Sequence, residues 1–468
     1  MESYPVGSPR YDRAAAYIEG FHRFGMRLGL SRLNRLLSHL GDPHLGLQVV
    51  HVAGTNGKGS TAALIASIAG EAGYRTALFT SPHLESYTER FVVDGLAISP
   101  ECFADLAEEI RPVVERMEAD GEDSPTAFEL LTAMACLEFL RRRVDLAVME
   151  VGLGGRLDGT NVFPRPLAAA LTSIDLDHTQ VLGNSVGRIA AEKCGVIHPG
   201  EPVVTTAVNP EALRVIRETC RRSGGLLWEL GRQFSASRSS WSLAGQEFSL
   251  RTPGRTYDKL EIPLPGPHQT DNAAGAAALA EILEGNGFRV PPEAVAAGLR
   301  RARWPGRFEV FSTAPLAVLD GAHNPGGMSA LRRTIEELWG ERSRPVLLLG
   351  MLEDKDIPGA LQVILPAVRA LVVTEPPVPR RAGCAEVAAL AARIAPGLDV
   401  RYEFLVDDAV AAALSLASRD GPAGSIVICG SLFLLAPARK ALERMVKTRV
   451  PLLSGQLVCP GRKDPPGT

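Results

Sequence analysis

The sequence lacks any run of 18 or more apolar residues, so it predicts no membrane-spanning helix. Its first twenty residues, MESYPVGSPRYDRAAAYIEG, lack the apolar core of a secretory signal. The seven cysteines are scattered and form no CxxC pair, which argues against a disulfide scaffold and against a zinc knuckle. We therefore expect reduced thiols in a cytoplasmic protein.

The sequence also lacks an excess of charge of either sign, internal repeats and low-complexity tracts. Its 50 lysines and arginines are balanced by 53 aspartates and glutamates, so the formal net charge is −3. That balance argues against a protein that binds nucleic acid through bulk positive charge, but it leaves room for a local basic pocket. With 46% hydrophobic and 22% charged residues, the composition is that of a globular protein with large apolar cores.

A length of 468 residues predicts two or three domains of about 150 residues each. Short apolar runs alternate with amphipathic segments, a pattern typical of βαβ units and a mainly parallel sheet. Residues 232–264 instead alternate and are rich in turn residues, which predicts a small antiparallel patch on the edge of the first domain. In that domain we expect helices at 99–119 and 126–143 and strands at 48–53, 76–80, 145–151, 167–174 and 202–207.

The second part of the chain predicts a Rossmann-like α/β domain. Pro-Gly in the run RWPGR at 303–307 breaks the preceding helix, so we place the linker there. The resulting domains are 1–302 and 308–450, followed by an unpacked tail at 451–468 that is rich in Pro and Gly. A cleft between two such domains is a favoured ligand site. The strands expected in the second domain are 316–320, 346–349, 370–374, 400–404 and 425–429.

The strongest local signal is the run VVHVAGTNGKGST at 49–61, in which an apolar strand enters a glycine-rich turn and then a helical run. Glycines allow close backbone approach, and N–H groups at a helix N-terminus bind phosphate. The spacing departs from GxxxxGK[ST], because Gly54 lies three positions before Gly57 rather than five and Gly59 separates Lys58 from Ser60. An ordinary glycine-rich turn would not combine strand, lysine, hydroxyls and helix, so we predict a P-loop-type domain.

In this phosphate loop, Lys58 would supply positive charge to the outer phosphates, and Ser60 or Thr61 would offer a hydroxyl to Mg²⁺. The residues predicted to bind nucleotide here are Gly54, Thr55, Asn56, Gly57, Lys58, Gly59, Ser60 and Thr61.

Polar groups stand at the ends of three predicted strands, and the carboxyl ends of parallel strands form the ligand edge of an open sheet. A hydroxyl, a carboxylate and an imidazole can anchor Mg²⁺ that is bound mainly by phosphates. A histidine alone would be read as a surface or capping residue, and Lys193 alone as a solvated lysine. The groups in question are Ser81 with His83, then Glu150, then Asp175, Asp177 and His178.

These motifs, in this order from residue 28 to residue 431, resemble the folylpolyglutamate synthase and dihydrofolate synthase family of the Mur ligase superfamily. Departures are few: Phe91, Gly159 and Cys194 replace residues that are usual in the family, and none is a proposed ligand. Beyond the phosphate loop, the resemblance rests on TSPHL (80–84) with ER (89–90), EVGLGGRLDGTN (150–161), LDHTQVLG (176–183) with EK (192–193), GPHQ (266–269) with Asn272, WPGR (304–307), DGAHN (320–324), GML (350–352) with DKD (354–356), and GSL (430–432).

The resemblance implies a role for individual residues. Lys193 matches a lysine that is carbamylated in the family, which would turn a cation into an anionic oxygen ligand. His323 matches a position near the reacting carboxylate and glutamate, so Lys58, Lys193 and His323 are the predicted catalytic residues. The metal ligands would be Ser60, Ser81, Glu150, His178 and Lys193. Further contacts to the nucleotide would come from Asn272, Arg307 and Asp320. Contacts to the substrate would come from Pro82, His83, Arg90 and Ser431.

The resemblance further implies an ATP-dependent amide ligase with two Mg²⁺ sites, monomeric and without nucleic-acid or membrane partners. ATP would phosphorylate a carboxylate, and the amine of L-glutamate would attack the acyl phosphate. The acceptor would be dihydropteroate, a reduced folate or both, and we expect both. Segments 24–30 and 82–90 would shape the pterin and aminobenzoate pocket.

Two other functions stay open at this stage. One is a Mur-type ligase acting on a UDP-linked cell-wall precursor, against which the LGGRLDGTN and DGAHNP motifs argue. The other is a non-catalytic nucleotide-dependent switch, which would need the phosphate loop but not Lys193, His178 and His323 together. Nucleotide hydrolysis that does not depend on glutamate would favour the switch.

Overall fold

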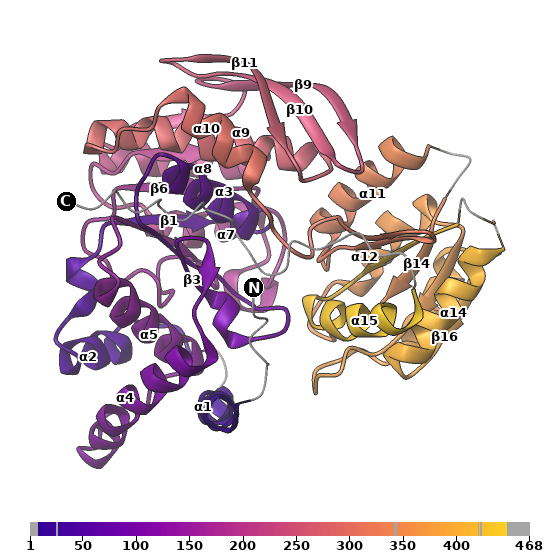
Figure 1. Cartoon of the computed structure of the whole chain (residues 1–468), viewed down its shortest axis with the longest axis horizontal. Helices are drawn as coiled ribbons and strands as arrows, with labels where there is room; N and C mark the ends of the chain where they lie inside the picture. Colours follow the sequence, from indigo (N-terminus) through magenta and orange to yellow (C-terminus); the bar gives the residue numbers. More distant parts are fainter. Residues whose placement is uncertain (1–7, 25–26, 341–343, 420, 422–423, 447–468) are drawn as a thin grey trace, which may run out of the picture.

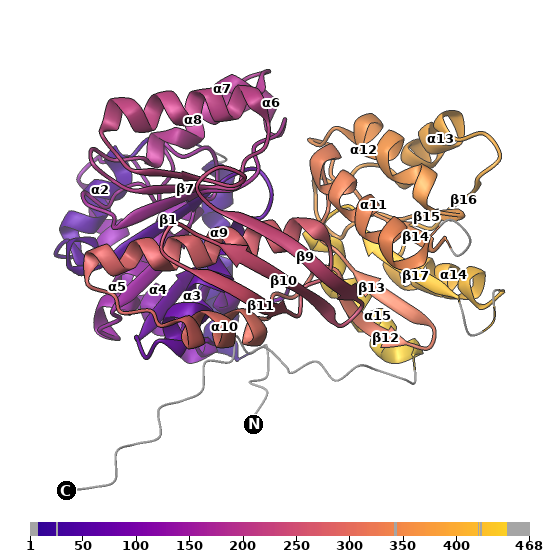
Figure 2. The same cartoon turned by 90° about the horizontal axis from the view of Figure 1, so that it is seen from above.

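The computed structural model describes residues 8–24, 27–340, 344–419, 421 and 424–446, so the predicted tail at 451–468 lies outside the described residues. Two α/β bodies lie side by side, with a three-stranded ribbon along one flank (Figures 1 and 2). We call residues 8–301 the N-terminal half and residues 309–446 the C-terminal half. Among the described residues, no helix is long and apolar enough to cross a membrane, and the six described cysteines are free thiols.

The N-terminal half is built on an eight-stranded sheet in the order β4-β3-β2-β5-β1-β6-β7-β8. The strands from β2 to β8 in that order are parallel, and β3 and β4 add an antiparallel edge. The predicted mainly parallel sheet is therefore confirmed. Its strands are β1 Val49–Ala53, β2 Thr76–Phe79, β3 Phe91–Val93, β4 Leu96–Ala97, β5 Leu146–Glu150, β6 Ala168–Leu171, β7 Val203–Thr205 and β8 Leu227–Glu229.

Helices cover both faces of this sheet, so its central strands are buried on both sides, as parallel sheets require. One core lies under α3, α9 and α10, a second under α1, α2, α4 and α5, and a third under α7 and α8. The helices are α1 Pro9–Gly20, α2 Ser31–His39, α3 Lys58–Glu71, α4 Pro100–Ala119, α5 Ala127–Arg141, α6 Thr179–Leu182, α7 Val186–Lys193, α8 Pro210–Ser223, α9 Pro267–Leu283 and α10 Pro292–Arg301.

The predicted antiparallel patch is a separate sheet in the order β11-β10-β9, formed by β9 Ser235–Ser242, β10 Gly245–Arg251 and β11 Thr256–Ile262. Its alternating apolar side chains, among them Phe248 and Leu250, are buried in the core that α9 also lines. Because the other face is polar, the ribbon keeps the period of two that the sequence displays.

The C-terminal half is a six-stranded sheet in the order β12-β13-β17-β14-β15-β16, parallel except for the edge strand β12. Helices α11, α12 and α13 cover one face, and α14 and α15 cover the other (Figure 2). The elements are β12 Glu309–Thr313, β13 Leu316–Leu319, α11 Pro325–Trp339, β14 Val346–Leu349, α12 Ile357–Ile364, β15 Ala370–Val373, α13 Cys384–Ile394, β16 Asp399–Tyr402, α14 Val406–Ser418, β17 Ser425–Cys429 and α15 Leu432–Met445.

The chain passes from one half to the other between α10 and β12, where the sequence analysis places the linker. We propose the two halves, divided at 303–307, as the domains of this protein. The position matters because Arg307 and Phe308 line the same pocket as the phosphate loop.

Candidate active site

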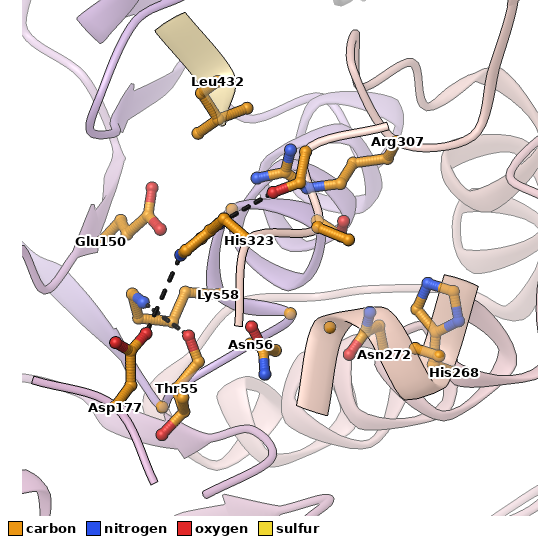
Figure 3. A pocket seen from close by; sticks show the side chains of 18 of the residues that line it. Thr55, Asn56, Lys58, Glu150, Asp177, His268, Asn272, Arg307, His323 and Leu432 are labelled. Carbon is orange, nitrogen blue, oxygen red and sulfur yellow. Dashed lines mark hydrogen bonds and ion pairs between the residues drawn. The ribbon is translucent and has the colours of Figure 1, made fainter. Parts of the chain in front are cut away.

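A pocket between the two halves collects most of the residues that the sequence predicts for the site (Figure 3). The phosphate loop and the ends of β2 and β5 form one wall, and the first turn of α9, the linker and the segment before α11 form the other. Of the predicted residues, the pocket is lined by Gly54, Thr55, Asn56, Gly57, Lys58, Gly59, Ser60, Ser81, Pro82, Glu150, His178, Lys193, Asn272, Arg307, Asp320 and His323.

The phosphate loop joins β1 to α3, and its glycines are required by the space around them. Gly57 has φ +89°, and a Cβ on it would lie 2.5 Å from Oδ1 of Asn272. A Cβ on Gly59 would lie 2.8 Å from the ring of Trp304. Only glycine therefore allows the loop to pass this close to α9 and the linker, with its N–H groups at the N-terminus of α3.

The polar side chains of the loop are placed for a ligand. Nζ of Lys58 lines the pocket and donates a hydrogen bond to the carbonyl of Thr55 at 3.1 Å. The hydroxyls of Ser60 and Thr61 are buried and have no hydrogen-bond partner among the described residues. A buried polar atom without a partner costs free energy, so the Ser60 hydroxyl, which lines the pocket, indicates a group that is bound at this position.

Glu150 ends β5 and projects into the pocket on the same wall as the phosphate loop (Figure 3). Its side chain is buried, and one carboxylate oxygen accepts a hydrogen bond from the backbone N–H of Ser81 at 3.1 Å. Burial raises the pKa of the Glu150 carboxyl, while the positive charge of Lys58 opposes that shift. A buried carboxylate facing a lysine and a phosphate loop is suited to hold a cation.

Asp177 and His178 follow β6 and meet the C-terminal half. Oδ1 of Asp177 pairs with Nζ of Lys355 at 2.9 Å, and both side chains are nearly buried. Burial works to raise the pKa of Asp177, but Lys355, His178 and His323 together outweigh it and lower that pKa. Burial, and then Lys355, lower the pKa of His178 to about 4. The imidazole of His178 is therefore neutral, which is the form that binds metal ions.

Lys193 ends α7 and is 5% exposed, although the sequence alone would place it in solvent. Its Nζ donates to the carbonyl of Gly54 in the phosphate loop at 2.6 Å. Burial, helped by the charge of Lys58, lowers the pKa of Lys193 to about 7. At neutral pH the Lys193 amine is therefore uncharged and nucleophilic in a large share of the protein molecules.

The opposite wall supplies Asn272, Arg307, Asp320 and His323. Asp320 follows β13 and is held by backbone N–H groups of Phe308 at 2.8 Å and Ala322 at 2.9 Å. His323 Nδ1 contacts the carbonyl of Gly321 at 2.8 Å, and its Nε2 lies 3.8 Å from Asp177. These residues come from the C-terminal half or the linker, apart from Asn272 on α9, so the site needs both halves.

Four predicted residues do not line this pocket. The hydroxyl of Thr61 is buried inside α3, and Ser431 caps α15 by accepting from the N–H of Phe433 at 3.2 Å. His83 and Arg90 form a separate pair, in which Nε of Arg90 donates to Nδ1 of His83 at 2.9 Å. Burial, and then Arg90, lower the pKa of His83 to about 3. Of segment 24–30, residues 25 and 26 lie outside the described residues.

Two residues at this site, His268 and Lys355, were given no role from the sequence. His268 on α9 lines the pocket, and its Nδ1 is buried without a partner among the described residues. Lys355 reaches the pair of Asp177 and His178 from the C-terminal half. Both belong to motifs in the sequence, GPHQ and DKD. A single histidine or lysine in a motif, however, does not indicate which distant residues its side chain lies near in the fold.

Asp158 positions the loop that follows Glu150. Its buried carboxylate accepts from the N–H of Leu153 at 2.8 Å, the N–H of Thr160 at 2.9 Å and the Thr160 hydroxyl at 2.6 Å. In the Asp158→Asn variant an NH₂ group would face one of these donors. We expect that variant to lose about 1–3 kcal/mol of unfolding free energy. Urea unfolding measures this, and an unchanged midpoint would contradict the role given to Asp158.

The donors in the pocket fit Mg²⁺ held chiefly by phosphates. Among the residues that the structure describes, no group of three or more His, Cys, Asp or Glu side chains could hold a metal alone. The pocket does offer the unpartnered Ser60 hydroxyl, the Glu150 carboxylate and the neutral His178. A few oxygen donors completed by phosphate oxygens is the usual Mg²⁺ arrangement.

Two family models match the chain: the Mur ligase middle domain over residues 52–280, and the Mur ligase, glutamate ligase domain over residues 306–432. The dihydrofolate synthase/folylpolyglutamate synthase of Bacillus subtilis is 35% identical over 92% of this chain and 99% of its own length. A crystal structure of Mycobacterium tuberculosis folylpolyglutamate synthase, complexed with ADP and AMPPCP, is 33% identical. It covers 92% of this chain and 98% of that one, with a TM-score of 0.85.

A further relative is longer than this chain. The probable bifunctional folylpolyglutamate synthase/dihydropteroate synthase of Halobacterium salinarum is 40% identical over 93% of this chain. This chain spans only 52% of that protein.

Proposed function

The chain belongs to the folylpolyglutamate synthase/dihydrofolate synthase family of Mur ligases, and from that premise we propose that it uses ATP to join L-glutamate to a folate-type acceptor. One observation carries the proposal: the phosphate loop with Lys58 faces Arg307, Asp320 and His323 across a single pocket. That arrangement would hold ATP between two halves that each supply polar groups, and a ligase needs such a site to bring a nucleotide, an acceptor and an amine together.

A carboxylate is a poor electrophile, so the reaction must first activate it. An acceptor carboxylate oxygen attacks the γ-phosphorus of ATP, and ADP leaves. The amine of L-glutamate then attacks the acyl carbon, and phosphate departs with the bridging oxygen while the amine loses a proton. The charged side chains of Lys58 and Arg307 stabilise negative charge on the transferred phosphoryl group. His323 lines the same pocket, and we propose that it lies near the acyl phosphate and glutamate, while Asn272 and Asp320 would hold the nucleoside.

Mg²⁺, when bound, would neutralise phosphate charge and polarise the γ-phosphate. We propose as its ligands the side chains of Ser60, Ser81, Glu150 and His178, with a carbamate on Lys193. The short distance from Lys193 Nζ to the Gly54 carbonyl, 2.6 Å, supports a place for Lys193 beside the phosphates. Two ions would divide these ligands between them.

We propose both dihydropteroate and reduced folates as acceptors. The Bacillus relative is named for both activities. In the Halobacterium relative the same region is joined to a dihydropteroate synthase, whose product would be an acceptor. Pro82 in the pocket and the buried pair of His83 and Arg90 on the following loop would face the acceptor. We further propose that the protein acts as a monomer in the cytoplasm.

Labelled L-glutamate tests the acceptors directly. Purified protein would receive ATP, Mg²⁺ and the label, with dihydropteroate in one reaction and tetrahydrofolate in another. We expect label in both products, because the acceptors share the pterin and aminobenzoate groups and each presents a terminal carboxylate. Label in one product alone would assign a single activity, and label in neither would refute the proposed function. A reaction without ATP is the control.

A further inference from the structure

The first turn of α11, in the C-terminal half, rests directly on the phosphate loop. Asn56 of the loop and Asn324, which caps α11, exchange two amide hydrogen bonds. Nδ2 of Asn56 donates to Oδ1 of Asn324 at 3.2 Å, and Nδ2 of Asn324 donates to Oδ1 of Asn56 at 3.1 Å. Asn324 is 2% exposed. This partly buried reciprocal pair is satisfied only while the two halves stay in this position.

The same amide reaches the loop that follows β6. Nδ2 of Asn324 also donates to Oδ2 of Asp177 at 2.8 Å, while Lys355 occupies the other oxygen of that carboxylate. Two side chains of the C-terminal half thus hold the two loops that present Lys58 and His178 to the pocket.

The backbone of α11 leaves no space at this contact. A Cβ added to Gly326 would lie 2.9 Å from Oδ2 of Asp175 and 3.0 Å from Nδ2 of Asn56. Real Cβ atoms essentially never come closer than 3.0 Å to such atoms, so an added methyl group would displace the side chains of Asp175 and Asn56 and disturb the pair of Asn56 and Asn324. Gly326 does not have a positive φ, so close approach rather than backbone conformation is what requires glycine here.

We propose that Asn56 and Asn324 are positioning residues. Through this pair, a nucleotide bound in the phosphate loop keeps α11 and the rest of the C-terminal half against the N-terminal half. Phosphate fixes the backbone of the loop through its N–H groups. The side chain of a residue in that loop, Asn56, then holds α11, which directly follows His323 and Asp320. The inference rests on the proposed function only in taking a nucleotide as the occupant of the loop.

Coupling of this kind is reciprocal: if nucleotide binding stabilises the contact, the contact must tighten nucleotide binding by the same factor. The structure provides a matched contact for comparison. Arg238 on β9 forms a bidentate ion pair with Glu337 on α11, at 2.8 and 2.7 Å, and so joins the same two halves. No residue of the phosphate loop takes part in that pair, so breaking it should leave the coupling intact.

Three variants test the proposal. Asn324→Asp keeps the oxygen that caps α11 at the N–H of Gly327, 2.8 Å away, but places a carboxylate against Asp177 and the Asn56 oxygen. Gly326→Ala removes no polar atom and adds one methyl group to the contact. Glu337→Gln weakens only the matched ion pair. Calorimetry would measure binding of a non-hydrolysable ATP analogue to each full-length variant, and small-angle X-ray scattering would measure the arrangement of the halves with that analogue bound.

We expect Asn324→Asp and Gly326→Ala to bind the analogue about tenfold more weakly than the unchanged protein and to scatter with a larger radius of gyration. Their affinity for the acceptor, which we propose to lie against Pro82, His83 and Arg90, should be unchanged. Glu337→Gln should keep the affinity for the analogue. Unchanged affinity and scattering in both contact variants, or an equal loss in Glu337→Gln, would overturn the proposal. If Asn324→Asp fails to fold, Gly326→Ala still decides the question. Because no turnover is measured, a failure to join glutamate would refute the proposed function without deciding this inference.

Discussion

Replacing Lys58 with alanine is expected to lower the rate of glutamate ligation by about 10²–10³-fold while the protein stays folded. Lys58 begins α3, and its ammonium group lines the pocket beside the phosphate loop. Among the described residues its side chain donates a single hydrogen bond, to the Thr55 carbonyl within the same loop, so the fold does not depend on it. In the reaction its charge would offset the negative charge on the transferred phosphoryl group, a stabilisation that water at the pocket mouth cannot replace.

The Lys259→Ala variant is a control, because it shows whether the loss of any lysine charge, rather than the charge in the pocket, lowers activity. Lys259→Ala removes a lysine whose side chain is 63% exposed on β11, where it pairs with Glu247. We expect that variant to keep full activity, since its ion pair is at the surface. Thermal unfolding would show whether Lys58→Ala is folded. A folded Lys58→Ala variant with normal turnover would contradict the role of the phosphate loop.

Replacing Lys193 should have an effect of similar size, and for a different reason. Both Lys193→Ala and Lys193→Arg are expected to lose about 10²-fold or more in ligation rate, although arginine keeps the positive charge. A carbamate forms when an uncharged amine attacks CO₂ and releases a proton, and arginine stays protonated. Equal loss in the two variants would indicate that the carbamate, rather than the cation, is needed. Full activity in Lys193→Arg would contradict the carbamate.

The pKa of Lys193 sets the pH range of this effect. Because burial lowers that pKa to about 7, the uncharged amine predominates above pH 7 and is lost as the pH falls below it. We therefore expect activity to depend on added bicarbonate, and the requirement to become more severe as the pH falls from 8 to 6. Carbon-13 NMR with labelled bicarbonate would detect the carbamate on the unchanged protein and not on Lys193→Arg. Activity that persists in CO₂-free buffer at every pH would refute this account.

The parts of the site that local sequence determines could be predicted. The strand, glycines and lysine at 49–61 form one continuous β1–loop–α3 unit. Because these residues are consecutive, their arrangement in space follows from the local sequence. Glu150 and His178 could be placed at strand ends, because parallel strands bring their carboxyl ends to one edge. Both do line the pocket.

Other features depend on contacts between distant segments, which a single sequence does not display. The burial of Lys193 arises because α7 packs beneath the phosphate loop, and its sequence neighbours are those of an ordinary surface helix. The pair of Asp177 and Lys355 joins residues 178 positions apart. Strands β3, β4, β8 and β12 were not predicted, because none of them is buried along its whole length and so none forms the bounded apolar run that identifies a central strand.

Transfer of oxygen from the acceptor to phosphate tests the central claim most directly. The acceptor carboxylate would be labelled with oxygen-18, and the protein would receive ATP, Mg²⁺ and L-glutamate. The acyl-phosphate route predicts that one labelled oxygen appears in phosphate for each glutamate joined, because phosphate leaves with the bridging oxygen. Phosphate without label, or ADP formed at the same rate when glutamate and acceptor are absent, would contradict ATP-driven ligation at this site.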